Sequence, residues 1–126
     1  MKPLRLDTAA LPLATWDDPA KGTVQWHSLF SKGHTESDSL TCGVGIIQPG
    51  EHFAAHRHAH AEVYFGIEGN ADVVIDGVAH RLSPGVALFI PGNAEHGVPE
   101  VSETLRWFYV FAADSFDEIT YRFTPL

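Results

Sequence analysis

The sequence has few cysteines and few basic residues, and each shortage excludes a class of protein. The single cysteine, Cys42, cannot form an internal disulfide, so the fold does not depend on an oxidising compartment. It lies in a strand-like run, and we expect it to be structural rather than a nucleophile. Eight basic side chains stand against 16 acidic ones. The resulting net charge of -8 disfavours binding to nucleic acid or to an anionic membrane surface.

Long apolar runs are also missing. Residues 1–7 lack the hydrophobic core of a signal peptide, and no stretch reaches the length of a membrane span. We therefore expect a cytoplasmic protein.

The chain has 126 residues, of which 44% are hydrophobic, and this is enough for one packed domain over residues 1–126.

Short β-type runs separated by turn residues fill most of the chain and predict an all-β sandwich or barrel. Prolines in residues 1–20 indicate an irregular N-terminal arm that packs on the barrel. Asp76-Gly77 predicts a tight hairpin, a second hairpin is expected over 98–111, and 86–90 reads as a buried strand. The predicted strands are 23–30, 40–48, 62–67, 71–75, 78–82, 86–90, 98–102, 105–111 and 119–123, with a loop over 31–39 and a helical turn within 112–118.

Histidines are concentrated in one segment, since four of the eight lie within residues 52–60. His56 and His58 are two positions apart, so an extended strand presents both imidazoles on one face. Imidazoles with a carboxylate such as Glu62 suit Fe, Mn, Ni, Zn or Cu. His96, which follows a Pro-Gly-Asn turn, can supply a ligand from a distant segment. The alternative is a solvated histidine-rich loop.

The spacing of these residues resembles the two motifs of the cupin superfamily. The first motif is matched by Gly50, His56, His58, Glu62 and Gly69, and the second by Gly85, Pro91, Asn93 and His96. Asn93 replaces the usual glycine and Glu100 a frequent asparagine, but neither position carries the metal. The resemblance implies a double-stranded β-helix (jelly-roll) barrel over about residues 22–111, a tendency to form homodimers, and one divalent transition metal (Fe, Mn, Ni or Zn) held by His56, His58, Glu62 and His96.

The chemistry of such a site favours a small carboxylate. Three neutral imidazoles and one carboxylate leave a divalent ion with a net charge of about +1, which attracts an anion. Tyr64 lies two residues beyond Glu62, so both face the barrel interior. A nearby cation lowers the pKa of a tyrosine, and a tyrosinate can abstract a proton next to a carboxylate. The alternative for Tyr64 is a core tyrosine that only packs.

Other residues are assigned less directly. His52 and His60 either join the site or lie on its rim, and His27, His34 and His80 are expected on surfaces or strand faces. Aromatic side chains either fill the core or form a cage for a sulfonium or ammonium group. Alternation divides 105–111 into two groups without showing which faces inward. The aromatic set is Trp26, Phe53, Phe65, Phe89, Trp107, Phe108, Tyr109, Phe111 and Tyr121.

Three segments, 61–64, 92–96 and 111–121, resemble the small single-domain cupin lyases that cleave dimethylsulfoniopropionate. This resemblance implies elimination of dimethyl sulfide from a metal-bound carboxylate substrate, which leaves acrylate. It also implies that Tyr64 is the base and that Trp26 and Tyr121 belong to the site. The alternatives are an iron-dependent dioxygenase, a sugar-acid isomerase or epimerase, and a ligand-binding cupin without enzymatic activity.

Overall fold

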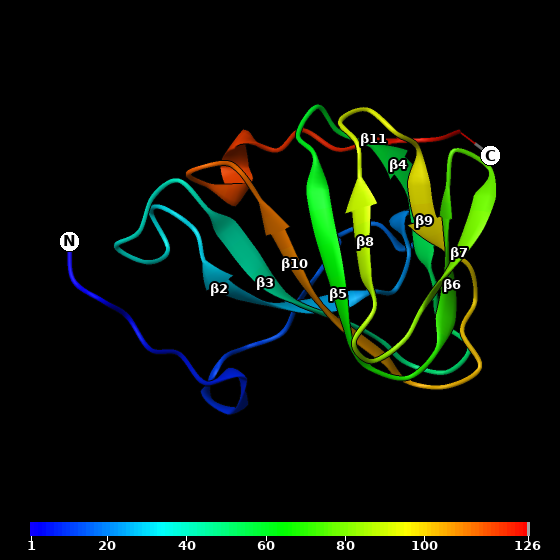
Figure 1. The fold of residues 1–126 in the computed structure, drawn as a ribbon, viewed down its shortest axis with the longest axis horizontal. Coiled ribbons are helices and arrows are strands. Elements are labelled where there is room, and N and C mark those ends of the chain that lie inside the picture. Colours follow the sequence, from blue (N-terminus) through cyan, green and yellow to red (C-terminus); the bar gives the residue numbers. More distant parts are fainter. Residues whose placement is uncertain (126) are drawn as a thin grey trace.

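The computed structural model describes residues 1–125 and consists of two antiparallel β-sheets packed face to face (Figure 1). One sheet has the strand order β1-β2-β3-β10-β5-β8 and the other β11-β4-β9-β6-β7. The predicted all-β barrel is therefore confirmed. The strands are β1 (Ala14–Thr15), β2 (Gln25–Phe30), β3 (Thr41–Ile47), β4 (Phe53–Arg57), β5 (Glu62–Glu68), β6 (Ala71–Ile75), β7 (Val78–Leu82), β8 (Ala87–Ile90), β9 (His96–Val98), β10 (Leu105–Phe111) and β11 (Arg122–Phe123).

Strand β10 shows how the six-stranded sheet forms one wall of the core. Its residues alternate between buried and partly exposed, beginning with buried Leu105. Because successive side chains of a strand point to opposite faces, the inward group is Leu105, Trp107, Tyr109 and Phe111. On the neighbouring strand β5 the same alternation turns Glu62 and Tyr64 inward.

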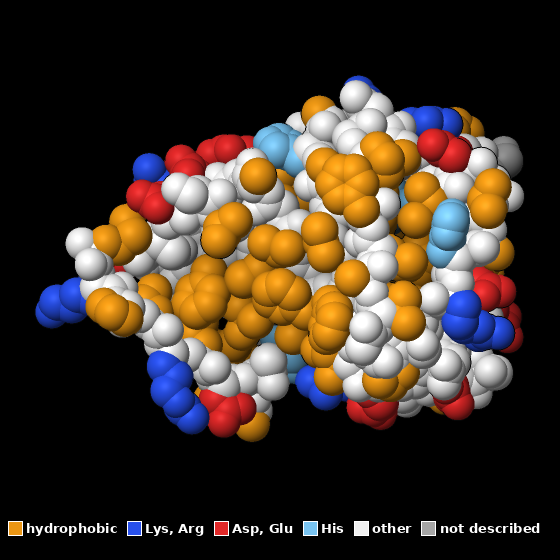
Figure 2. All heavy atoms as spheres, in the orientation of Figure 1, with side chains coloured by type: hydrophobic (Ala, Val, Ile, Leu, Met, Phe, Trp, Pro, Cys, Tyr) orange, Lys and Arg blue, Asp and Glu red, His pale blue; other side chains and the backbone are white. Residues whose placement is uncertain are grey.

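The outer face of this sheet is apolar as well. Figure 2 shows hydrophobic side chains gathered over β3, β10 and β5, and Phe65 and Phe89 are 44% and 67% exposed. The strand predicted over 86–90 is present as β8, but its expected burial was wrong, because only Ile90 is buried there. Strand β8 is the edge of its sheet, so its outward side chains have a neighbouring strand on one side only.

The turns of the two predicted hairpins had different outcomes. Asp76 and Gly77 have φ values of 47° and 79° and join β6 to β7, as their sequence predicts. The expected hairpin over 98–111 was wrong. Strand β9 pairs with β4 and β6 in one sheet, whereas β10 pairs with β3 and β5 in the other. The segment between β9 and β10 is thus a crossover between sheets.

The C-terminal tail and residues 14–22 of the N-terminal arm pack against the barrel, whereas residues 1–11 are mostly exposed and extend away from it (Figure 1). The N-terminal arm is mostly irregular, as predicted, with the 3-10 helices η1 (Thr8–Ala10) and η2 (Pro19–Lys21), and β1 pairs with β2. The C-terminal tail contains the 3-10 helix η3 (Phe116–Glu118) and β11, which pairs with β4 beside His56. These additions bring aromatic side chains from both parts of the sequence together, with the ring centroid of Trp16 4.9 Å from that of Tyr121 and 5.4 Å from that of Phe123.

Among the residues that the structure describes, no helix has the length and apolar character needed to cross a membrane.

Cys42 is buried, and burial raises the pKa of its thiol above the ordinary value of 9.0. A thiol with a raised pKa is a poor nucleophile, which agrees with the structural role expected for Cys42.

Candidate metal centre and cavity

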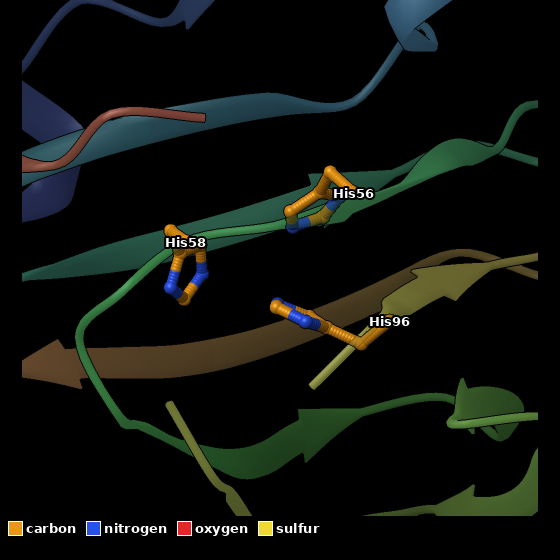
Figure 3. Close-up of side chains that lie close together, drawn as sticks. All are labelled: His56, His58 and His96. Carbon is orange, nitrogen blue, oxygen red and sulfur yellow. The ribbon is translucent and has the colours of Figure 1, made fainter. Parts of the chain in front are cut away.

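Three histidines meet inside the barrel. His56 lies on β4, His58 follows the end of β4, and His96 begins β9, where it pairs with His56 across the two strands. Their relative exposures are 0%, 1% and 1%. Figure 3 shows the rings turned toward one another, and one ring nitrogen of each lies within 4.8 Å of the others. The fold therefore brings together histidines that are far apart in the sequence.

Each of these rings uses Nδ1 to bond a backbone carbonyl two residues away, at 2.7–2.9 Å. A carbonyl only accepts hydrogen bonds, so Nδ1 carries the proton, and Nε2 of a neutral ring keeps its lone pair. Metal-binding histidines commonly show this arrangement, because the second nitrogen's bond holds the ring in place. The pairs are His56 with Ala54, His58 with His60, and His96 with Ala94.

Glu62 brings a carboxylate to the same point from the start of β5. It is 4% exposed, and its Oε1 lies 3.2 Å from Nε2 of His58 and 3.4 Å from Nε2 of His96. With Nδ1 protonated, a neutral ring and a carboxylate both direct lone pairs at this space. The His58 contact lies within hydrogen-bond range, and the same oxygen is placed to serve beside the histidines as a metal ligand.

The donor set fits a divalent transition metal. Nε2 of His56 and Nε2 of His96 are buried, and neither has a hydrogen-bond partner within residues 1–125. Burial first, and the neighbouring His96 second, lower the pKa of His56 well below 6.5. His56 is therefore neutral near pH 7, the form that a metal ion needs. The three buried histidines could bind a metal ion, and imidazole with carboxylate suits Fe, Mn, Ni or Zn without selecting one of them.

The other histidines lie outside this cluster. His60 supports the site through its backbone, which accepts the bond from His58, while its ring Nδ1 is buried without a partner in the described part of the chain. His52 is partly exposed and lines a separate groove beside β4 and β9. As expected for surface residues, His34 and His80 are exposed, and His27 is partly exposed.

A small cavity lies beside Glu62 and has mostly aromatic walls. The aromatic set proposed from the sequence divides clearly. Phe65 and Phe89 are exposed on the outside of the barrel, and Phe108 alternates outward on β10. Phe111 is buried in the core. The members that line the cavity are Trp26, Phe53, Trp107, Tyr109 and Tyr121.

Sequence reasoning missed two aromatic residues of this cavity, Trp16 and Phe116. Trp16 comes from the arm, and its ring centroid lies 5.1 Å from that of Trp26 and 4.9 Å from that of Tyr121. Lys21 places its Nζ 5.5 Å from the centre of the Trp16 ring, a cation–π arrangement. The sequence feature that could have indicated Trp16 is a large apolar side chain in an arm that is otherwise rich in proline and charged residues, because such a side chain is stable only when it packs against the rest of the protein.

The three tyrosines of the chain all surround Glu62. Tyr64, Tyr109 and Tyr121 line the cavity, and burial raises the pKa of each above 10. The negative charge of Glu62 is the second cause in every case. Ser28 partly offsets these effects at Tyr109 through a hydrogen bond, which lowers its pKa. Without a cation in the site, these hydroxyls are therefore neutral at physiological pH.

Two glycines on β3 provide the space for this wall. Gly43 pairs with Tyr109 and Gly45 with Trp107 across the strands. A Cβ at Gly45 would stand 2.5 Å from Cζ2 of Trp107, and one at Gly43 would overlap the ring and hydroxyl of Tyr109. Both aromatic side chains of β10 thus lie across the bare backbone of β3, and this leaves the interior beside Glu62 open.

Comparison with known proteins adds independent evidence. A family model described as "Cupin domain" matches residues 43–111. Dimethylsulfoniopropionate lyase DddW of Ruegeria pomeroyi is 42% identical over 122 residues, which are 97% of this chain and 80% of that protein. A 5-aminosalicylate 1,2-dioxygenase of Comamonas is 33% identical over 72% of this chain but only 24% of its own length. The structure of the polyketide cyclase RemF from Streptomyces resistomycificus has a TM-score of 0.79 at 20% identity, over 99% of this chain and 87% of that chain, and shows the fold alone.

Proposed function

This chain belongs to the cupin family, and we propose that it is a metal-dependent lyase that cleaves dimethylsulfoniopropionate to dimethyl sulfide and acrylate. The 42% identity with dimethylsulfoniopropionate lyase DddW, over nearly the whole chain, supports the choice of substrate. The single observation that carries the reaction type is the placement of Tyr64 beside Glu62 in one cavity with aromatic walls.

In this proposal His56, His58, Glu62 and His96 hold one divalent ion. The free Nε2 atoms and the close Glu62 oxygen support that assignment. A divalent ion bound there supplies Lewis acidity, which stabilises negative charge that develops on a coordinated carboxylate. The rest of the reaction is assigned to the side chains of this chain.

Tyr64 is the proposed base. Its oxygen takes the proton from the carbon next to the substrate carboxylate. The electron pair of that C–H bond forms the C=C bond of acrylate, and the C–S bond breaks with its electron pair on sulfur. Dimethyl sulfide therefore leaves as a neutral molecule. Because burial and Glu62 raise the pKa of Tyr64, this role depends on the positive charge of the site to favour the tyrosinate.

The aromatic walls suit the other end of the substrate. Trp16, Trp26 and Phe116 line the same cavity as Tyr64 and Tyr121. A sulfonium group is attracted to the faces of such rings by the cation–π interaction. We propose that Tyr121, whose ring centroid is 5.0 Å from that of His58, helps to hold the substrate between the metal site and these rings.

The proposal is tested with purified protein loaded separately with Fe, Mn, Ni and Zn. We expect at least one metal form to release dimethyl sulfide from dimethylsulfoniopropionate, detected as gas, with acrylate in equal amount. A panel of other small carboxylates establishes the preference. Absence of dimethyl sulfide from every fully loaded form would refute the assigned substrate.

An iron-dependent dioxygenase is the second candidate. Two observations favour it, namely the histidine cluster and the identity with the 5-aminosalicylate dioxygenase of Comamonas. The two candidates are separated by an oxygen electrode, since only the dioxygenase consumes oxygen when the iron-loaded protein meets its substrate.

Two further expectations stay predictions. Exposed apolar side chains on the outer face of the six-stranded sheet, Phe65, Ile67 and Phe89 among them, are compatible with a homodimer. Sedimentation measurements would establish the assembly state.

The cytoplasmic location is an expectation to be tested by cell fractionation.

A further inference from the structure

Trp107 is a buried residue of the cavity wall to which the proposed reaction assigns no role. It points inward from β10, it is 2% exposed, and it lines the cavity that also contains Glu62 and Tyr64. Its indole Nε1 is buried and has no hydrogen-bond partner among residues 1–125. The ring itself is well fixed, because it lies over Gly45 and its centroid is 5.3 Å from that of Tyr64.

A buried N–H group without an acceptor is costly. Leaving such a donor unpaired destabilises a folded protein by about 1–3 kcal/mol, so buried donors are nearly always bonded. The indole N–H only donates, so its missing partner must be an acceptor. The cavity wall also carries the Glu62 carboxylate and tyrosine hydroxyls, but none of the described residues accepts a bond from this N–H.

We propose that the indole N–H of Trp107 donates a hydrogen bond to a carboxylate oxygen of the ligand. The inference rests on the proposed function in one respect, since it takes a carboxylate as the ligand's anionic group. A carboxylate bound to a metal by one oxygen has a second oxygen that still accepts hydrogen bonds. Trp107, which shares the cavity with Glu62, provides a donor for that oxygen.

Trp107 is therefore a positioning residue for the substrate carboxylate. A fixed donor restricts rotation of the carboxylate and so orients the adjacent carbon. Gly45 contributes to this positioning, because a side chain at position 45 would displace the indole ring of Trp107. Trp16 carries a second buried indole N–H without a partner in the described residues and lines the same cavity, but it belongs to the arm rather than to the barrel wall.

Nuclear magnetic resonance tests the bond without relying on turnover. The chain has three tryptophans, so the zinc-loaded protein, which is diamagnetic, should give three indole N–H signals. We expect propionate to shift the Trp107 indole proton downfield and to slow its exchange with solvent. Tetramethylammonium should not produce this shift. An indole signal that is unchanged by saturating propionate, or that responds only to tetramethylammonium, would overturn the proposal.

Substitution provides a second test. Trp107→Phe removes the N–H and keeps an aromatic ring, so propionate should bind about 10-fold to 100-fold more weakly at unchanged metal content. Phe108→Leu, on the same strand but facing outward, is the matched control and should bind propionate as the wild type does. Equal propionate affinity in Trp107→Phe and wild type would refute the role of Trp107. If Trp107→Phe does not fold, the spectrum of the wild type decides the matter.

The two proposals can fail separately. If the wild type releases no dimethyl sulfide but propionate shifts the Trp107 signal, the assigned substrate is wrong and the carboxylate donor stands. If the wild type is an active lyase and the KM of Trp107→Phe for dimethylsulfoniopropionate is unchanged, the donor is wrong and the lyase stands.

Discussion

At the residue scale, the histidine rings are oriented by hydrogen bonds to the backbone. The Nδ1 bonds of His56, His58 and His96 assign the free lone pair of each neutral ring to Nε2. The resemblance to the cupin motifs predicted which residues would meet, because the motifs are defined by the spacing of residues along the chain. The sequence could not predict which ring nitrogen carries the proton, because this depends on backbone carbonyls whose direction is defined only in the folded protein.

His96→Ala should lose most of the bound metal while the fold persists. The substitution removes the imidazole that β9 contributes to the proposed metal site, so the metal affinity should fall by more than the roughly 10–100-fold typical of losing a supporting group. Elemental analysis after dialysis measures the metal content. His80→Ala, at an exposed position on β7, is the control and should remain loaded. Full occupancy in His96→Ala would remove His96 from the ligand set.

Tyr64→Phe should retain the metal and lose turnover by about 10²–10⁴-fold, the usual contribution of a general base. The loss should appear in kcat more than in KM, because the carboxylate is still held. Burial and the charge of Glu62 raise the pKa of Tyr64, and a base acts only when deprotonated. Wild-type activity should therefore rise with pH on the alkaline side, and the variant should lack this limb. Tyr109→Phe is the comparison, since its hydroxyl is bonded to Ser28 and should matter less. Wild-type elimination in Tyr64→Phe would exclude Tyr64 as the base.

At the scale of elements, local signals were reliable where the chain turns back on itself directly. The Asp-Gly pair at 76–77 requires no distant partner to form its turn, and the hairpin between β6 and β7 was predicted correctly. The error at β9 and β10 has the opposite cause. Of the predicted strand 98–102 only Val98 lies in a strand, as the end of β9, and the pairing of β9 and β10 depends on long-range packing that assigns them to different sheets. The N-terminal arm was recognised as irregular, while the docking of Trp16 into the cavity depends equally on distant partners.

The turn before β9 explains the departure of this chain from the second cupin motif. Asn93, which stands where glycine is usual, has a φ of 64°, and asparagine tolerates this left-handed region better than most residues. Its backbone N–H donates to His58, and its carbonyl accepts from Arg57. Its side-chain oxygen accepts a bond from Arg122 at 3.0 Å. The turn thus ties β11 and the end of β4 to the segment that carries His96.

Substitutions at Asn93 should separate backbone strain from side-chain bonding. Asn93→Ala should lower the free energy of unfolding by about 1–2 kcal/mol, because alanine pays the left-handed conformational cost and cannot bond Arg122. Asn93→Gly loses the same bond without the strain, so it should be the more stable variant. Urea denaturation of the three proteins gives the comparison. If alanine and glycine are equally stable, backbone strain at this turn is not the determinant.

At the scale of the whole molecule, the barrel should stand without its metal. Within residues 1–125, nineteen hydrophobic residues are buried, and aromatic residues of the N-terminal arm and the C-terminal tail pack against this core. A metal ion that binds only the folded state adds stability by linkage, about 3 kcal/mol at a concentration 100 times its Kd. Removing metal with a chelator should lower the Tm by roughly 10 °C without abolishing the thermal transition. Loss of β-sheet circular dichroism on chelation at room temperature would contradict this.

The ionisation of tyrosine connects the cavity to the stability of the whole chain. All three tyrosines have raised pKa values in the folded protein, whereas each titrates near 10 when unfolded. Above pH 10 the unfolded state therefore binds fewer protons than the folded state, so the free energy of unfolding should fall as pH rises. In the metal-free protein we expect tyrosinate absorbance to appear together with loss of circular dichroism, in one transition well above pH 10. With metal bound, one tyrosine should ionise before unfolding, and Tyr64→Phe should remove that early step, because the proposed base is the tyrosine whose ionised form the cation stabilises. Tyrosinate that forms near pH 10 in the folded, metal-free protein would contradict the buried placement of these hydroxyls.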